Sequence, residues 1–432
     1  MTKDRPLDPV AAVLEQVAVR RPALIDLGLS RVERTLDRLG APHRRTPPVF
    51  HVAGTNGKGS TCAYVRAILE ASGARVHAFT SPHLVRYAER ITLAGAEIAD
   101  AAFIAAIRRV DEAAGADDLT LFETITCAAF IAFAETPADY LVLEVGLGGR
   151  LDATNVIDRP LAAAVTPIAL DHQNFLGDTL AAIAAEKAGI FRSAAPAVVG
   201  PQSAEAMAVF ERAAARLRAP LFAFGSAWTS WTENGRLIYQ DELGLSDLAP
   251  PRLIGAHQFM NAGLAVACVR AAGLSFTDEI LSAGLQGARW PARLQRLKSG
   301  PLVKALGAGG ELWLDGGHNP HAARALSLAL ADMEEKNSRP LILITGMQEN
   351  KDIDGFFAAF SGLAASVLAV QADHSGARTP DDVAAAAARA GISAFSCGSL
   401  IEAAKRAAAA GPARVLICGS LYLAGEVLRD NA

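Results

Sequence analysis

The chain has 432 residues, of which 51% are hydrophobic and 20% are charged, and its formal net charge is −4. This length exceeds what one hydrophobic core usually supports, so we expect two domains. The small negative charge gives no electrostatic reason to expect a nucleic-acid partner or a membrane surface. No segment approaches the length of an uncharged apolar membrane span, and no signal peptide is indicated, so a cytoplasmic protein is expected.

A glycine-rich turn follows the first clear strand of the chain. Residues 49–53 are typical of a short buried strand, and residues 62–69 of a helix with one apolar face. Between them lie Gly54, Thr55, Asn56, Gly57, Lys58, Gly59 and Ser60. Backbone N–H groups and the positive end of the helix would bind phosphate oxygens there, and Lys58 would add a charge.

This turn departs from the usual phosphate-binding loop. Only two residues separate its first two glycines, and Gly59 stands between Lys58 and Ser60. We therefore predict a nucleotide site of an unusual subtype, with an ordinary glycine turn as the alternative.

Short apolar runs then alternate with helical patterns, which favours a mainly parallel sheet covered by helices. The predicted strands span residues 75–80, 140–145, 161–166 and 197–199. Residues 228–240 contain Asn234-Gly235 between alternating side chains, which predicts a hairpin and hence a small antiparallel appendage.

A second alternating series follows two predicted helices at 255–270 and 276–284 and a break at Pro291. Its predicted strands span residues 311–314, 341–345, 365–370 and 414–418. We place the domain boundary near residue 297, giving domains 1–297 and 298–432, the second of which is long enough for its own core.

Acids end one predicted strand in each domain, at Glu144 and Asp315. A carboxylate in this position is costly unless it meets a cation or hydrogen-bond donors, and ligands of open α/β sheets collect at such strand ends. Glu144 is therefore a candidate ligand for Mg²⁺, with a hydrogen-bonded strand-end Glu as the alternative. For Asp315 the alternative is a strand-to-helix turn in which Asn319 caps the helix.

Other polar residues are ambiguous when taken alone. Taken alone, Lys187 is typical of a surface lysine whose aliphatic stem lies along its helix. His172 is typical of a structural residue that caps a turn. His257 and Asn261 lie one helical turn apart and suit either capping or ligand binding. Asp152 would be an exposed turn residue next to a packed Phe122.

The order of motifs resembles the Mur ligase superfamily, in particular its folate branch, the folylpolyglutamate and dihydrofolate synthases. The matching blocks are A-G-T-N-G-K-G-S at 53–60, T-S-P-H-L at 80–84, F-E at 122–123, E-V-G-L-G-G-R-L-D-A-T-N at 144–155, L-D-H at 170–172, E-K-A-G-I at 186–190 and D-G-G-H-N-P at 315–320. The resemblance covers nearly the whole chain, from about residue 26 to residue 419.

The resemblance implies an α/β fold in which a smaller Rossmann-like C-terminal domain closes over ATP bound to the phosphate-loop domain. It assigns Mg²⁺ to Ser81, Glu144 and His172, and implies that CO₂ carbamylates Lys187 into a further metal ligand. The nucleotide contacts that it implies beyond the loop are Asn261, Arg293, Asp315 and His318. The family usually has glycine before that arginine, where this chain has Ala292.

The resemblance also implies a pteroate pocket lined by Asp26, Leu27, Phe122, Glu123, Leu151, Asp152 and Ala153. Phe122 would stack on the pterin ring and Asp152 would accept its N–H donors. The expected enzyme is a monomer that joins L-glutamate to 7,8-dihydropteroate or a reduced folate through an acyl phosphate, with Lys58, His172 and Lys187 in the chemistry. The alternatives are a cell-wall amino-acid ligase and, in another class, a phosphate-loop switch or transport ATPase.

Overall fold

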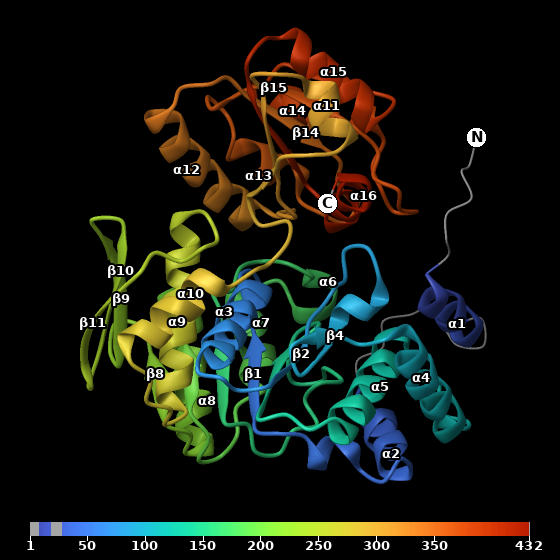
Figure 1. Ribbon diagram of the computed structural model, residues 1–432, viewed down its shortest axis with the longest axis vertical. Helices are drawn as coiled ribbons and strands as arrows, with labels where there is room; N and C mark the ends of the chain where they lie inside the picture. The colour runs from blue at the N-terminus through green and yellow to red at the C-terminus, as the bar shows by residue number, and fades with distance from the viewer. Residues whose placement is uncertain (1–7, 19–27, 432) are drawn as a thin grey trace. The chain divides into compact units, whose positions relative to one another are not determined.

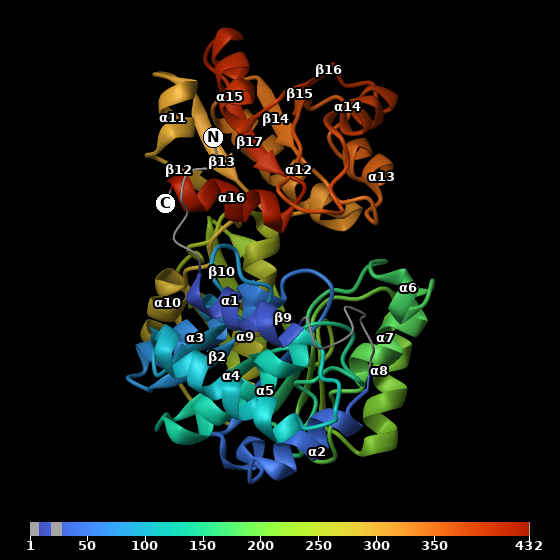
Figure 2. The same ribbon diagram turned by 90° about the vertical axis from the view of Figure 1, so that its right-hand side faces the viewer.

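The computed structural model describes residues 8–18 and 28–431, which form two compact units. The first unit comprises the chain up to Arg252 together with Phe259–Ala288. The second comprises Leu253–Gln258 and the chain from Arg289 onward. Figures 1 and 2 show the elements of both units from two directions.

The first unit is built on an eight-stranded sheet with the order β4-β3-β2-β5-β1-β6-β7-β8. Its strands are β1 (Val49–Ala53), β2 (Val76–Phe79), β3 (Ile91–Leu93), β4 (Ala96–Glu97), β5 (Tyr140–Glu144), β6 (Ala162–Val165), β7 (Ala197–Val199) and β8 (Leu221–Ala223). All neighbours from β2 to β8 pair in parallel, whereas β3 pairs antiparallel with β2 on one side and with the edge strand β4 on the other. The prediction of a mainly parallel sheet is confirmed.

Helices cover this sheet. They are α1 (Pro9–Ala18), α2 (Ser30–Arg38), α3 (Lys58–Ala71), α4 (Asp100–Ala114), α5 (Leu121–Glu135), α6 (Gln173–Leu176), α7 (Leu180–Ala188), α8 (Ala204–Leu217), α9 (Ala256–Ala271) and α10 (Asp278–Gly287), with short 3₁₀ turns at Pro42–Arg45 and Tyr87–Arg90. One hydrophobic cluster packs β2 and β5 against α4 and α5, and another packs β6 and β7 against α7 and α8. Burial of these apolar faces stabilises the unit around the carboxyl end of β1.

The predicted hairpin is confirmed as part of a three-stranded antiparallel sheet. Its strands are β9 (Trp228–Glu233), β10 (Arg236–Asp241) and β11 (Gly244–Leu248). Asn234 and Gly235, which join β9 to β10, both have positive φ angles of 50° and 75°. Two such residues form the tight turn that matches the twist of the flanking strands.

The second unit holds a six-stranded sheet with the order β12-β13-β17-β14-β15-β16. Its strands are β12 (Gln295–Leu297), β13 (Glu311–Leu314), β14 (Leu341–Thr345), β15 (Ala364–Ala369), β16 (Ala394–Ser396) and β17 (Arg414–Cys418). Only the edge strand β12 is antiparallel. The four predicted strands are present, and the two unpredicted ones are the three-residue strands at the sheet edges.

The helices of the second unit are α11 (Pro301–Leu306), α12 (Pro320–Lys336), α13 (Ile353–Ala358), α14 (Pro380–Arg389), α15 (Leu400–Ala409) and α16 (Leu421–Asn431). Its main cluster packs β14, β15 and β17 against α12, α13 and α14. The unit therefore has a hydrophobic core of its own. Across the described ranges of both units, no helix is long and apolar enough to cross a membrane.

Candidate active site

The predicted strand, glycine turn and helix are confirmed, and the helix begins earlier than expected. Helix α3 starts at Lys58 directly after Gly57, so Lys58, Gly59 and Ser60 form its first turn. Their N–H groups belong to the helix end that has no intrahelical acceptor, and that end carries the positive pole of the helix dipole. The turn therefore has the geometry of an anion site.

Two glycines of the turn are required by close packing as well as by their backbone angles. Gly54 has φ +143°, and a Cβ there would lie 1.8 Å from Thr166 Oγ1. Gly57 has φ +92°, and a Cβ there would lie 2.5 Å from Asn261 Oδ1. Asn261, predicted from helix spacing and resemblance to contact the nucleotide, thus lies directly against the loop.

Two lysines from distant parts of the sequence converge on one carbonyl of this loop. Lys58 Nζ donates to the oxygens of Gly54 at 3.1 Å and Thr55 at 3.2 Å. Lys187 Nζ, at the end of α7, donates to the same Gly54 oxygen at 2.8 Å. The side chains of the two predicted catalytic lysines are therefore neighbours.

Lys187 is 4% exposed, so the interpretation of it as a surface lysine is wrong. Its neighbours Ala184 and Ala188 on α7 are part of a hydrophobic cluster, which explains why the lysine is enclosed. Burial, reinforced by the charge of Lys58, lowers the pKa of Lys187 to about 7. A substantial fraction of the amine is then neutral near physiological pH.

Glu144 ends β5 beside the loop strand, in register with Val52 of β1. Its side chain is buried, and its Oε2 accepts a hydrogen bond from the Ser81 N–H at 3.0 Å. A carboxylate and a serine hydroxyl next to a phosphate loop are oxygen donors of the kind that Mg²⁺ prefers. The residues present therefore fit such a cation.

His172 is exposed, has φ +52°, and donates its backbone N–H to the Asp171 carboxylate. It is the N-cap residue of α6, where its carbonyl oxygen accepts from Phe175 N and Leu176 N and its side chain makes no capping bond. Within the described ranges, no three His, Cys, Asp or Glu side chains gather in a group that could hold a metal. A cation here would need Ser81, phosphate oxygens or water among its ligands.

The predicted substrate residues Leu151, Asp152 and Ala153 follow the glycine turn Gly148-Gly149 that comes after β5. Phe122 packs so closely on Gly146 that a Cβ there would be 2.4 Å from its ring. Asp152 is 3% exposed, so its interpretation as an exposed turn residue is wrong. Its Oδ1 accepts from Thr154 N at 3.0 Å and Thr154 Oγ1 at 2.5 Å, and its Oδ2 accepts from Leu147 N at 2.9 Å.

Asp152 is also coupled to the strand that leads into the phosphate loop. The Thr154 hydroxyl donates to Asp152, so His51 Nε2 on β1, 2.9 Å from that hydroxyl, donates to it in turn. Burial raises the pKa of Asp152, and its hydrogen bonds oppose that shift. Leu151 is half-buried and Ala153 is buried, whereas Asp26 and Leu27 lie outside the described residues.

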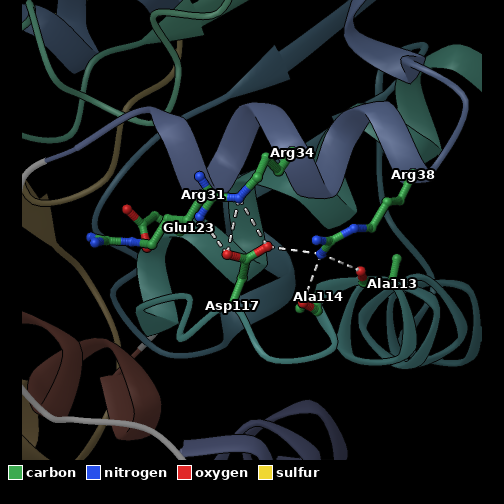
Figure 3. Close-up of polar contacts among 7 residues, drawn as sticks. All are labelled: Arg31, Arg34, Arg38, Ala113, Ala114, Asp117 and Glu123. Carbon is green, nitrogen blue, oxygen red and sulfur yellow. Dashed lines mark hydrogen bonds and ion pairs between the residues drawn. The ribbon is translucent and has the colours of Figure 1, made fainter.

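Glu123 has a structural role that went unpredicted. Its carboxylate accepts from Thr120 N, and its own N–H is donated to Thr120 Oγ1, which forms a capping box at the start of α5. The pattern Thr120-x-x-Glu123 is a recognised signal for a helix start and was readable in the sequence. Arg31 of α2 also donates to Glu123 at 2.8 Å (Figure 3).

In the second unit, Arg293, Asp315 and His318 gather around Gly316. Asp315 accepts from Leu294 N at 2.7 Å and Gly317 N at 2.6 Å, and burial raises its pKa against the opposing charge of Arg293. His318 Nδ1 donates to Gly316 O at 2.9 Å. Asn319 accepts from Ala322 N, which confirms the predicted helix cap.

The turn before Arg293 carries backbone strain. Ala292, where the resembling family usually has glycine, has φ +53° and is fully buried. This left-handed conformation favours glycine, because a Cβ approaches the following carbonyl oxygen. The Gly316 N–H donates to Ala292 O at 3.0 Å and holds the turn in place.

Comparison with known proteins follows the same division of the chain. The Mur ligase middle domain matches residues 52–269, and the Mur ligase glutamate ligase domain matches residues 301–421. The dihydrofolate synthase/folylpolyglutamate synthase of Escherichia coli is 39% identical over 350 residues, covering 81% of this chain and 79% of the relative.

Two solved structures superpose over nearly the whole chain. FolC of Escherichia coli, in complex with DHPP and ADP, has a TM-score of 0.87 at 33% identity and covers 99% of this chain and 98% of its own. A bifunctional folylpolyglutamate synthase/dihydrofolate synthase with Mn, AMPPNP and L-glutamate bound has a TM-score of 0.84 at 34% identity, covering 98% of each chain.

The fold and the phosphate-loop site define an ATP-dependent ligase of the Mur type. More particularly, the chain belongs to the Mur ligase family, in the branch of the dihydrofolate synthases and folylpolyglutamate synthases. The family, fold class and enzyme class predicted from the motifs are confirmed.

Proposed function

We propose that this enzyme is bifunctional and joins L-glutamate both to 7,8-dihydropteroate and to reduced folates. The observation that supports this most is the turn Leu151–Asn155, which holds Asp152 on Gly146, the residue against which Phe122 packs, and connects it to the phosphate-loop strand through Thr154 and His51. The similarity to an Escherichia coli enzyme named for both activities points the same way.

The chemistry requires activation of a carboxylate, whose leaving group would otherwise be oxide. Transfer of the γ-phosphoryl group of ATP to a carboxylate oxygen forms an acyl phosphate and releases ADP. The amine of glutamate then attacks the acyl carbon, loses a proton, and expels phosphate to leave the amide. Lys58 and the N–H groups at the start of α3 would hold the phosphates and balance the developing charge.

Ser81 and Glu144 would hold Mg²⁺, with His172 and Lys187 as the further ligands that the family resemblance implies. When bound, the cation supplies positive charge beside the transferred phosphoryl group. The neutral amine of Lys187 can attack CO₂, forming an N–C bond and releasing a proton, to give a carbamate that carries a negative charge. The low pKa of Lys187 supports this step, because only the unprotonated amine is a nucleophile.

Phe122 would stack on the pterin ring, next to the turn that Asp152 organises, with Glu123, Leu151 and Ala153 completing the surface. Arg293, Asp315 and His318, which lie together in the second unit, would contact the nucleotide, and so would Asn261 of the first unit, as the family resemblance implies. We propose that the functional boundary between an ATP-binding and a C-terminal domain lies at residue 297, whereas the compact second unit begins at Arg289 and so includes Arg293. The enzyme is proposed to act as a cytoplasmic monomer without a nucleic-acid partner.

The deciding experiment gives the enzyme ATP, Mg²⁺ and L-glutamate together with one of three acceptors: 7,8-dihydropteroate, tetrahydrofolate or a UDP-muramoyl compound. Phosphate release and formation of the amide product are measured for each acceptor. We expect turnover with both pterin substrates and none with the muramoyl acceptor. Lys58→Ala should lower kcat at least ~10²-fold, the scale for removing one preorganised electrostatic group. Turnover of the muramoyl acceptor alone would refute the proposed function and favour a cell-wall ligase.

A further inference from the structure

Helix α2 packs on its unit through buried Val32 and Leu36 and also carries three arginines that form ion pairs with the unit. Arg31, Arg34 and Arg38 extend from this helix toward the segment between α4 and α5 (Figure 3). Arg34 and Arg38 both pair with Asp117, and their side chains are 53% and 49% exposed. Exposed pairs of this kind are screened by water and contribute little.

The third pair differs because it is buried. The side chains of Arg31 and Glu123 are 15% and 6% exposed, and Arg31 Nε lies 2.8 Å from Glu123 Oε2. The same oxygen accepts the Thr120 N–H at 2.7 Å, so Arg31 completes the capping box of α5 from outside the helix. Losing the arginine would leave a buried carboxylate with one donor fewer.

The first turn of α5 that this pair fixes also carries Phe122. The Phe122 ring is 6.0 Å from the ring of Phe79 and lies directly against Gly146, where no side chain would fit. Gly146 and Leu147 donate their N–H groups to Asp152. A small shift in the start of α5 would therefore move the aromatic ring and press on the Asp152 turn.

We propose that Arg31 is a positioning residue for the pterin substrate, acting through Glu123 on Phe122. The proposal rests on the proposed function, because it assumes that Phe122 and the Asp152 turn form the pterin-binding surface. Arg31 sets the position of the ring and leaves the phosphate loop unchanged. Loss of Arg31 should therefore raise KM for the pterin substrate and leave KM for ATP nearly unchanged.

The test compares Arg31→Met with Arg34→Met, a matched control on the same helix whose own side chain is 53% exposed. For each variant, kcat, KM for dihydropteroate, KM for ATP and Tm are measured. We expect Arg31→Met to raise KM for dihydropteroate about 10-fold, since displacement of a positioning group by about 1 Å can cost up to ~10²-fold in rate. KM for ATP should stay within about twofold, and Arg34→Met should change neither KM.

Three further variants test the route through Glu123. Glu123→Gln keeps the helix cap, because glutamine also serves in a capping box, but loses the ion pair. It should raise KM for dihydropteroate as Arg31→Met does, and the double variant should be no worse than either single one. Arg31→Lys should restore part of the loss. Glu123→Gln and Arg31→Lys keep the inference testable even if Arg31→Met folds poorly.

An unchanged KM for dihydropteroate in Arg31→Met would overturn the inference. So would equal rises in both KM values with a lowered Tm, which indicate a merely structural role, or an equal effect of Arg34→Met. Failure of the proposed function is recognised separately, because the unaltered enzyme would then not turn over dihydropteroate at all.

Discussion

At the scale of single residues, Lys187 shows how a buried cation can be poised for chemistry. Enclosure within an alanine-rich helix and proximity to Lys58 lower its pKa to about 7. The ordinary pKa of a lysine is 10.5. Between pH 7 and pH 10.5, Lys187 therefore keeps its proton in the unfolded chain but has released it in the folded enzyme. The free energy of unfolding attributable to this group therefore rises with pH across that window, and the gain is absent below about pH 7.

Lys187→Met should accordingly be inactive without being less stable. We expect kcat to fall at least ~10²-fold, while Tm at pH 7 stays equal or rises because an apolar side chain replaces a buried ammonium. Lys187→Ala should be partly rescued by formate or acetate, which would supply the missing anion beside the metal. Lys336→Met, which alters an exposed lysine, is the control. A fully active Lys187→Ala enzyme would exclude the carbamate.

The sequence predicted the loop residues well because their signal is local, whereas the environment of Lys187 depends on a distant contact. Its hydrogen-bond partner Gly54 is 133 positions away in the sequence, and no pattern within α7 indicates it. The Arg31–Glu123 pair, 92 positions apart, is hidden for the same reason. The burial of Asp152 escaped prediction because its donors arise from a turn, which has no periodicity to read.

At the scale of elements, the turn between β5 and β6 holds its shape around one carboxylate. Asp152→Ala should remove the acceptor for Leu147 N, Thr154 N and Thr154 Oγ1 together. An unsatisfied buried donor costs roughly 1–3 kcal/mol, so Tm should fall. We expect glutamate addition to dihydropteroate and to tetrahydrofolate to decline together, because the turn and the nearby Phe122 are displaced in both.

Asp158→Ala, which removes an exposed acid a few residues later, is the matched control and should change neither activity nor Tm. A selective loss of the dihydropteroate reaction at unchanged Tm would instead show that Asp152 accepts hydrogen bonds directly from the pterin. The inner strands on either side of this turn were predictable as apolar runs. The short strands β3, β4, β8, β12 and β16, none of which was predicted, have only two or three residues and carry too little pattern to detect.

At the scale of the whole molecule, the nucleotide should stabilise the folded enzyme through residues of both units. A ligand present at 100 times its Kd stabilises the folded state by about 2.7 kcal/mol. Adding AMPPNP with Mg²⁺ should therefore raise Tm by several degrees, and Lys58→Ala should abolish this shift. Arg293→Met should reduce it, if residues of the second unit contact the nucleotide as proposed.

The exposed Arg86→Met is the control for a lost arginine and should leave the shift intact. A full shift in Arg293→Met would mean that the first unit alone holds the nucleotide. Calorimetry of the free and bound enzyme measures both outcomes directly.

Helix α9 is shared between the two units, which restricts how the chain can be divided into fragments. Its opening residues, up to Gln258, belong to the second unit, and from Phe259 it belongs to the first. A fragment that begins at Arg289 would lack the six residues Leu253–Gln258 that complete the C-terminal unit. A single truncation or a single fusion point therefore cannot give the complete C-terminal unit. A domain exchange between relatives must also include the upstream segment Leu253–Gln258.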